Sequence, residues 1–368
     1  MKANAEAIEG AGFSRYMGEP NVFKRRKDGV LIKIAVYVDN LLLFYKRCPK
    51  ADAQIKEFIT TYKKRFRIDI RGELKTFLGM EVTRDRSNKT LTLTQSSYIK
   101  DIFGKFLGEH AKPMVVPVLS TATDEFMRIS GPKDDAERAG MRNRPFLALM
   151  GSLIWCTMTH PEISYHTAFL CQHMHDPSEA AWDAALKVLA YLYHVRNLGL
   201  NYDGTRPTVV CYSDASWNPP DGPVPFGGHV VLFCGAAVSF SSRKIKIVPQ
   251  SSAEAETALY SMACKDLRFC QLLLDFIEFK IELPTRVRCD NQAAIACVKN
   301  PGVTMRTRHY EIWVHLGRWQ YLHKISEPEF TPTTRQLADI FTKALDRTTF
   351  CLFRNTILNL KTEAKISI

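Results

Sequence analysis

The chain has 368 residues, and 46% of them are hydrophobic, which is enough apolar material for two or three domains with cores of their own. Fifty Lys and Arg residues exceed 38 Asp and Glu residues, so the net charge of +12 favours a polyanion such as nucleic acid as partner. The ten cysteines include no Cys-x-x-Cys pair, which argues against a zinc site or a disulfide framework. The N-terminus lacks the pattern of a signal peptide, and no apolar run approaches the roughly 18 residues of a membrane span. We therefore expect an intracellular protein of the cytoplasm or nucleus, neither secreted nor inserted in a membrane.

The first strong local pattern is Val30–Tyr45, two apolar arms around Asp39 and Asn40 that predict a buried hairpin. An aspartate at a hairpin tip has two interpretations. Aspartate is favoured in turns because it hydrogen-bonds the local backbone, and two rigid strands can also present it to a metal ion. The hairpin alone favours the turn.

The next 150 residues alternate strand and helix patterns. Periodicity predicts helices over residues 51–66, 96–107, 146–158, 163–173 and 180–193, and strands over residues 77–82 and 91–95. The prolines and small polar residues of Lys112–Lys133 predict a linker, and Asn201–Pro207 predicts a turn.

The C-terminal part predicts a mixed five-stranded sheet flanked by helices. Strands are expected at residues 208–213, 228–234, 236–242, 285–289 and 325–330. A long helix follows the third strand, and further helices are expected from Gln292, over Tyr310–Leu322 and from Thr334. Pro328 places the fifth strand at an edge, because proline cannot donate to ladders on both sides.

Four acids fall where such a sheet would bring its ends together. Asp214 ends the first strand, Asp290 follows the fourth, and Asp339 lies early in the expected last helix. In the long helix Glu256 lies on the apolar stripe, whereas Glu254 stands three residues after a serine, the spacing of a capping box.

Each of these acids also has an ordinary interpretation. Asp290 at a strand-to-helix junction is typical of a helix cap, and Asp339 is a favourable charge near a helix start. Together, four carboxylates without a Cys or His cluster predict a hard-cation site.

Several motifs resemble the Pol polyproteins of Ty1/copia-type retrotransposons. Motifs similar to the ribonuclease H domain are Tyr212–Trp217, Ser251–Glu256, Cys289–Ile295, Arg306–His309 and Gln336–Lys343. Motifs similar to the later reverse transcriptase and its connection are Tyr37–Asn40, Phe77–Gly79, Leu91–Gln95, Gly151–Leu153 and Thr159–Ile163.

The resemblance implies an α/β chain of the α+β multi-domain kind. Residues 1–125 would form a truncated reverse transcriptase palm and thumb, residues 126–204 a helical connection, and residues 205–368 a ribonuclease H-like domain with the mixed five-stranded sheet.

The resemblance also implies a reaction. Two Mg²⁺ ions, with Mn²⁺ as the alternative, would be held by Asp214, Glu256, Asp290 and Asp339, and the RNA strand of an RNA–DNA hybrid would be hydrolysed. Asn291 would contact the 2′-hydroxyl. His309 would assist substrate binding or product release, or would simply start a helix. The expected partners are the hybrid and other parts of the polyprotein.

Departures from the family pattern predict that polymerase activity is absent. Asn40 replaces the second acid of the Tyr-Val-Asp-Asp motif, so Asp39 and Asn40 form a degenerate polymerase site, and residues 1–29 are too few to contain the other polymerase aspartate. Pro219–Phe226 replaces a basic turn and Ile245 a common glutamine, which affects substrate contacts rather than the acids.

Two rival hypotheses remain open. One is a catalytically silent nucleic-acid-binding remnant. The other is a transposase-like nuclease, which would need glutamate where Asp339 stands.

Overall fold

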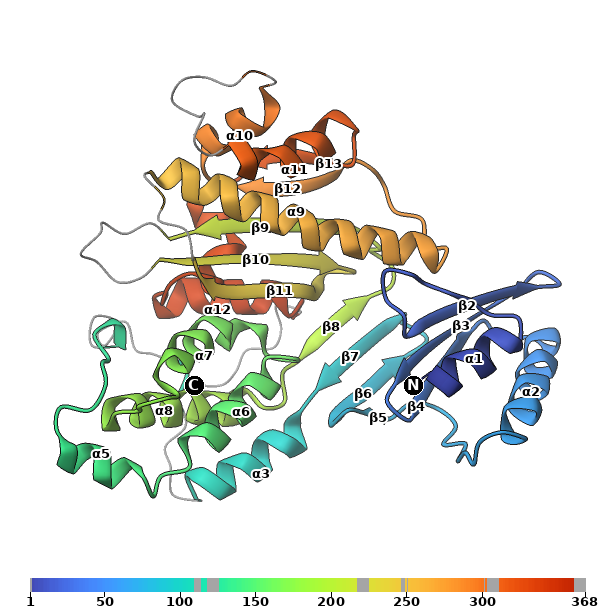
Figure 1. The fold of residues 1–368 in the computed structure, drawn as a ribbon, viewed down its shortest axis with the longest axis horizontal. Coiled ribbons are helices and arrows are strands. Elements are labelled where there is room, and N and C mark those ends of the chain that lie inside the picture. The colour runs from blue at the N-terminus through green and yellow to red at the C-terminus, as the bar shows by residue number, and fades with distance from the viewer. Residues whose placement is uncertain are drawn as a thin grey trace. The chain divides into compact units, whose positions relative to one another are not determined.

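The computed structural model describes residues 2–108, 114–117, 126–216, 225–245, 249, 251–300, 302 and 311–360 (Figure 1). The chain divides into two compact units, of which the first comprises Met1–Leu74 with Arg268–Ile281 and the second Lys75–Leu267 with Glu282–Ile368. The domain boundaries at residues 125 and 204 stay predictions. None of the described helices is long and apolar enough to cross a membrane.

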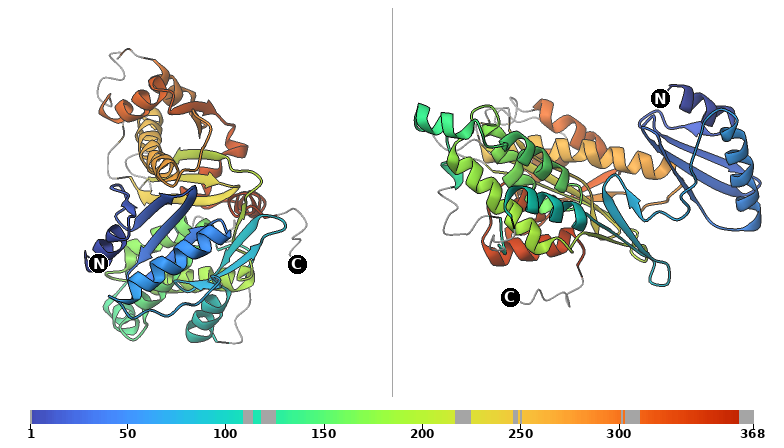
Figure 2. Two further views of the ribbon diagram at one scale, coloured as in Figure 1. Left: turned by 90° about the vertical axis from the view of Figure 1, so that its right-hand side faces the viewer. Right: turned by 90° about the horizontal axis from the view of Figure 1, so that it is seen from below.

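The first unit contains a four-stranded antiparallel sheet. Its strands, in spatial order, are β1 (Ser14–Arg15), β2 (Val22–Lys27), β3 (Val30–Tyr37) and β4 (Asn40–Tyr45). Burial alternates along β3, so one face carries the core residues that pack against Ile8 of α1 (Lys2–Gly10) and Phe58 of α2 (Pro49–Lys63). Figure 2 shows α2 along this face.

The predicted hairpin is confirmed, with two corrections. Tyr37 pairs with Asn40, so the turn residues are Val38 and Asp39 rather than Asp39 and Asn40, and Val38 takes the left-handed conformation with φ of 52°. The tip was expected to be buried, but Tyr37 and Val38 are 48% and 61% exposed. The apolar arms are partly covered in β4, whereas the turn extends beyond the core.

The second unit begins with a small antiparallel sheet and a group of helices. The sheet runs β5 (Thr76–Phe77), β6 (Met80–Asp85), β7 (Thr90–Thr94) and β8 (Leu200–Asp203). The helices are α3 (Ser96–Phe106), α5 (Asp135–Met141), α6 (Phe146–Cys156), α7 (Ser164–Leu170) and α8 (Glu179–Val195), with 3-10 turns η2 (Pro161–Ile163) and η3 (Cys171–His173). The predicted linker Lys112–Lys133 lies partly outside the described residues, which include 114–117 and 126–133 of it.

The turn predicted over Asn201–Pro207 lies at Gly204 and Thr205, whereas the first three residues of that range belong to strand β8. Leu200 pairs with Leu93, and Asp203 pairs with Thr90. A partner more than 100 residues away in the sequence leaves no local signature, so the short pattern alone was misleading.

The mixed five-stranded sheet is confirmed. Its order is β11 (Ala236–Lys244), β10 (Phe226–Phe233), β9 (Val209–Ala215), β12 (Thr285–Cys289) and β13 (Ser326–Phe330). β9, β10 and β11 are antiparallel neighbours, whereas β9, β12 and β13 run parallel. β13 is an edge strand, as Pro328 predicted.

Two layers cover this sheet (Figure 1). Helices α9 (Ser252–Phe276), α10 (Gln292–Lys299) and α11 (Glu311–Leu322) pack together on one side, with Gly317 of α11 against Tyr260 and Val298. On the other side lie η6 (Leu337–Phe341) and α12 (Arg347–Ile357), together with α7. One hydrophobic cluster joins this second face to α6, α7 and α8, and Tyr165 meets Phe226 edge to face at 5.2 Å between ring centroids.

The predicted last helix from Thr334 is wrong in its position. Two 3-10 turns, η5 (Thr333–Arg335) and η6, occupy that stretch, and α12 begins only at Arg347, where Asp346 caps it. Gln336 Nε2 donates to the backbone oxygen of Ser213 at 2.9 Å. We attribute the short turns to such side-chain bonds, which hold the segment against β9.

Candidate metal centre

Asp214 lies near the end of the central strand β9 and is only 4% exposed. It pairs with Gly228 of β10, so both residues face the layer that contains η6. Thr342 Oγ1 donates a short hydrogen bond to Asp214 Oδ2. The carboxylate is therefore fixed by a hydroxyl that immediately follows η6.

Two consecutive glycines allow both layers to approach the sheet next to Asp214. A Cβ at Gly227 would lie 2.3 Å from Leu259 Cδ1 of α9, and a Cβ at Gly228 would lie 2.5 Å from Phe341 Cβ of η6. Successive residues of a strand face opposite sides, so the two glycines admit α9 and η6 in turn.

Glu256 reaches the same region from the second turn of α9. Ser251 Oγ accepts a hydrogen bond from the Glu254 amide at 3.2 Å, which confirms the predicted cap. Glu256 is 5% exposed and Glu254 is 7% exposed, so both glutamates are buried. Burial, followed by the charges of Asp214 and Asp290, raises the pKa of Glu256 well above its usual range.

Asp290 directly follows β12 and is half-buried. Its Oδ2 accepts a hydrogen bond from Thr333 Oγ1 at 2.8 Å. The alternative that Asp290 caps the next helix is wrong, because Asn291 does so: its Oδ1 accepts from the amide of Ala294 at 3.0 Å. Asp290 is thus placed by the strand end rather than by a capping role.

Asp339 belongs to η6 and is 3% exposed. Its Oδ2 lies 2.8 Å from Lys343 Nζ, whereas its Oδ1 is buried and has no hydrogen-bond partner among the described residues. Burial, followed by the charge of Asp214, raises the pKa of Asp339 to about 7, and Lys343 opposes that shift.

These side chains form two overlapping groups of ligand atoms. Asp214, Asp290 and Asp339 offer oxygens that all lie within 4.8 Å of one another, and Glu256, Cys289 and Asp290 offer ligand atoms within the same limit. Asp290 is common to both groups, so the four predicted acids and Cys289 form one cluster, named here the ligand cluster.

The ligand cluster has the chemistry of a cation site. Carboxylate oxygens are the ligands that hard divalent cations prefer, and an unpaired buried carboxylate oxygen such as Asp339 Oδ1 is costly without a cation. Lys343 contacts Asp339, and burial alone would lower its pKa, but Asp214 and Asp339 raise it overall. The residues present therefore fit a divalent ion, and their role as ligands stays a prediction.

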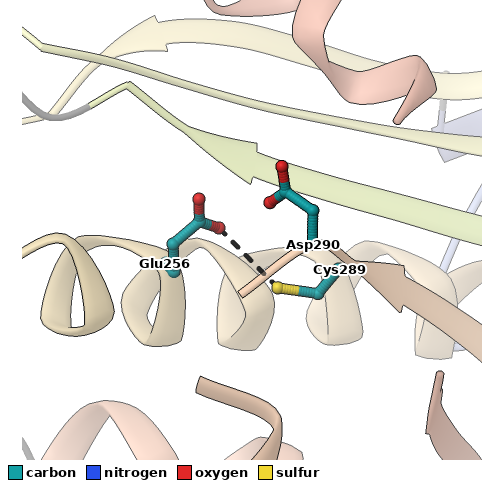
Figure 3. Close-up of side chains that lie close together, drawn as sticks. All are labelled: Glu256, Cys289 and Asp290. Atoms are coloured by element: carbon teal, nitrogen blue, oxygen red, sulfur yellow. Dashed lines mark hydrogen bonds between the residues drawn. The ribbon is translucent and has the colours of Figure 1, made fainter. Parts of the chain in front are cut away.

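Cys289 was missed as a candidate. Its Sγ donates to Glu256 Oε2 at 3.8 Å, and the thiol points toward that carboxylate (Figure 3). Cysteines were judged by pairing motifs alone, and Cys289 has no cysteine partner in sequence. The available signal was its position directly before a candidate acid at a strand end.

Other predicted residues lie elsewhere. His309 and most of Pro219–Phe226 lie outside the described residues. Ile245 is 9% exposed and packs with Ala255 and Leu259 in a hydrophobic cluster. Asp39 belongs to neither group of candidate metal ligands found in the described part of the chain.

No family model matches the chain. It is 29% identical over 350 residues to the retrovirus-related Pol polyprotein from transposon RE1 of Arabidopsis thaliana, which covers 94% of this chain and 23% of that protein. It is 26% identical over 337 residues to the Pol polyprotein from transposon TNT 1-94 of Nicotiana tabacum, and the match covers 91% of this chain and 25% of that protein. The chain thus spans about a quarter of the length of these relatives.

A putative transposon Ty5-1 protein of Saccharomyces cerevisiae is 31% identical over 250 residues, covering 67% of this chain and 77% of that protein. Among solved structures, LC11-RNase H1 in complex with an RNA/DNA hybrid is 14% identical with a TM-score of 0.28, covering 37% of this chain and 94% of that chain. RNase H1 from Halobacterium salinarum NRC-1 is 15% identical with a TM-score of 0.26, covering 37% and 94%. On its similarity to the Ty5-1 protein and to the plant polyproteins, the chain belongs to the Ty1/copia-type retrotransposon Pol family.

Proposed function

We propose that the second unit hydrolyses the RNA strand of RNA–DNA hybrids in a reaction that needs divalent cations. The observation that carries this proposal is the ligand cluster, in which acids from four separate segments meet near the end of the central strand and leave Asp339 Oδ1 buried without a hydrogen-bond partner among the described residues. Most buried polar atoms in folded proteins are hydrogen-bonded, so this unpaired oxygen within a cluster of carboxylates supports a bound cation.

The proposed ligands are Asp214, Asp290 and Asp339 for one ion and Glu256 with Asp290 for a second, with Mg²⁺ as the natural metal and Mn²⁺ as a substitute. Such ions polarise phosphoryl oxygens and lower the pKa of bound water.

The chain's own contribution is positioning. Thr342 donates to Asp214 and Thr333 donates to Asp290, so each carboxylate presents a fixed oxygen. Second-shell bonds of this kind orient ligands, and their loss typically lowers metal affinity or activity by about 10- to 100-fold.

The proposed substrate contacts involve the overall charge and Asn291. The net charge of +12 suits a polyanion. Asn291 Oδ1 caps α10, and we propose Asn291 Nδ2 as a donor to a 2′-hydroxyl. The role of His309 and a partnership with other parts of the polyprotein remain predictions.

The test is cleavage of a labelled hybrid by the purified full chain with Mg²⁺. Asp214→Asn should abolish cleavage, whereas Asp183→Asn, a change of an exposed aspartate on α8, should leave it intact. Equal cleavage by the wild type and Asp214→Asn would contradict the proposal. Hybrid binding without any cleavage by the wild type would favour the silent remnant instead.

We also propose that the chain lacks polymerase activity. Asn40 is neutral, and Asp39 stands in an exposed turn outside both groups of ligand atoms. Templated primer extension that Asp39→Ala abolishes would overturn this part of the proposal.

A further inference from the structure

Cys289 contributes a thiol to the ligand cluster. It ends β12 and is fully buried, yet its Sγ lies 3.8 Å from Glu256 Oε2 and within 4.8 Å of ligand atoms of both Glu256 and Asp290. Figure 3 shows the thiol directed at the Glu256 carboxylate, with Asp290 next to it in sequence. Buried cysteines ordinarily behave as small hydrophobic residues, but the neighbours of this one are acids.

A second observation points to a cation in the same place. Asp339 is 3% exposed, and its Oδ1 has no hydrogen-bond partner among the described residues. An oxygen of Asp339 lies within 4.8 Å of an oxygen of Asp290. Asp290 also belongs to the second group of ligand atoms, the one that contains Cys289. The thiol therefore belongs to a cluster in which a buried carboxylate oxygen has no hydrogen-bond partner among the described residues, and a cation would stabilise that oxygen.

We propose that Cys289 makes the ligand cluster a binding site for a thiophilic divalent cation, of the class of Zn²⁺, which competes there with Mg²⁺. The inference rests on the proposed metal centre and adds its selectivity. Mg²⁺ binds oxygen ligands, whereas a thiolate with one or two carboxylates is a donor set that zinc and its heavier relatives take up. On binding, the sulfur–metal bond replaces the S–H bond, and the proton passes to solvent.

The ligand cluster offers donor atoms for such a cation and a side from which the cation can enter. Glu256 and Cys289 are buried, whereas Asp290 is half-buried, so a cation reaches the cluster on the Asp290 side. The bound cation would occupy a carboxylate that the hydrolytic reaction also needs. Competition between the two classes of metal follows directly from this shared ligand.

The test uses Cd²⁺ as the probe, because a cadmium–thiolate bond gives a charge-transfer absorption in the ultraviolet. The full chain should carry Cys48→Ser in every protein, since Cys48 is exposed and its sulfur accepts a helix-cap bond that serine can also accept. Cys289→Ser and Cys289→Ala are then compared with Cys211→Ala, which removes a buried cysteine of the neighbouring strand outside both ligand groups.

We expect a saturable absorption in the parent protein and in Cys211→Ala, diminished by excess Mn²⁺ and lost in both Cys289 variants. In hybrid cleavage with Mg²⁺, the Cd²⁺ concentration that halves the rate should rise at least about tenfold in Cys289→Ser, since even second-shell changes shift metal affinity by that much. The same absorption in the Cys289 variants, or no saturable absorption in the parent, would overturn the inference.

Asp290→Asn provides a second measurement that does not depend on how the cysteine variants fold. It retains the thiol and removes one carboxylate, so the absorption should remain but require at least about tenfold more Cd²⁺. An unchanged requirement would count against the inference. Failure of the proposed function looks different, because a parent protein that shows the absorption but never cleaves the hybrid keeps the thiophilic site and loses only the hydrolytic role.

Discussion

Gly228 is the point where the sheet and the Asp339 segment come closest, and Gly228→Ala is the sharpest structural perturbation of the proposed centre. The φ angle of Gly228 is not positive, so the need for glycine is one of space. An added Cβ would lie 2.5 Å from Phe341 Cβ, 3.1 Å from Thr342 Cγ2 and 3.2 Å from the carbonyl carbon of Phe341. A Cβ and a carbonyl carbon cannot rotate away, so η6 itself must move.

The magnitude follows from what moves with η6. Overpacking of this kind typically costs about 1–3 kcal/mol of unfolding free energy. The same displacement carries Asp339 and stretches the bond from Thr342 to Asp214. A misplacement of roughly 1 Å lowers a catalysed rate on the order of 100-fold, so cleavage should fall far more than stability alone would require.

Gly227→Ala is the matched control, and urea unfolding with hybrid cleavage at saturating Mg²⁺ is the assay. A Cβ at position 227 would lie 2.3 Å from Leu259 Cδ1, on the side of the sheet opposite η6. The end of that leucine side chain can shift. It should lose less activity per kcal/mol of lost stability than Gly228→Ala. Wild-type stability and rate in Gly228→Ala would refute the reasoning, as would the reverse order of the two variants.

Three further predictions concern the same unit. The folded state raises the pKa of Asp339 from 3.8 to about 7, so it holds a proton that the unfolded chain has lost, and the metal-free protein should become less stable as pH rises through that window. Thermal melting should therefore show a larger stabilisation by Mg²⁺ at about pH 8 than at about pH 5. Thr342→Val removes the donor to Asp214 and should lower the affinity for Mg²⁺. The Mg²⁺ concentration needed for half-maximal cleavage should therefore rise by about 10- to 100-fold in a metal titration. Arg354→Met should cost about 3 kcal/mol in urea unfolding, because it removes a buried positive charge that is electrostatically coupled to the buried Glu162. Adding Glu162→Gln should restore part of that loss.

Each of these has an outcome that would count against it. A metal-free protein whose melting temperature is flat or rises between about pH 4 and pH 7 would contradict the assignment of Asp339. Thr356→Val, an exposed threonine of α12, should leave the Mg²⁺ titration unchanged, and an equal shift in both threonine variants would remove the argument for Thr342. A double variant of Arg354 and Glu162 that is less stable than either single variant would show that the two do not act as a pair.

Local patterns predicted the parts of the site that local chemistry determines. The run ending in Asp214 is a strand because its residues are apolar and β-branched, and Glu256 turns inward because it lies on the apolar stripe of α9. The edge position of Pro328 followed from its missing donor.

What the sequence did not predict depends on partners that are distant along the chain. Cys289 meets Glu256 across 33 residues, and Thr342 meets Asp214 across 128. The apolar run that contains Asp339 reads as a helix by itself, but we attribute its two short turns to the bond from Gln336 to β9. Periodicity measures which side of an element is buried, and it contains no information about which polar group stands opposite.

The helical region around residue 160 is connected to the proposed metal centre through η6. Glu162 is completely buried in η2, where its Oε1 accepts from Tyr191 OH at 3.0 Å and lies 2.9 Å from His160 Nδ1. Burial acts against the charge of Arg354 on α12, but Tyr191, Cys351 and Glu162 raise its pKa overall, so Arg354 is electrostatically coupled to Glu162. Both η2 and α12 contact η6, the segment that carries Asp339. A buried polar network tolerates little displacement, because each member that loses its partner costs free energy. The position of Asp339 is therefore set from the helical side as well as from the sheet, and Arg354→Met should lower the affinity of the centre for Mg²⁺ although Arg354 is not among the proposed ligands.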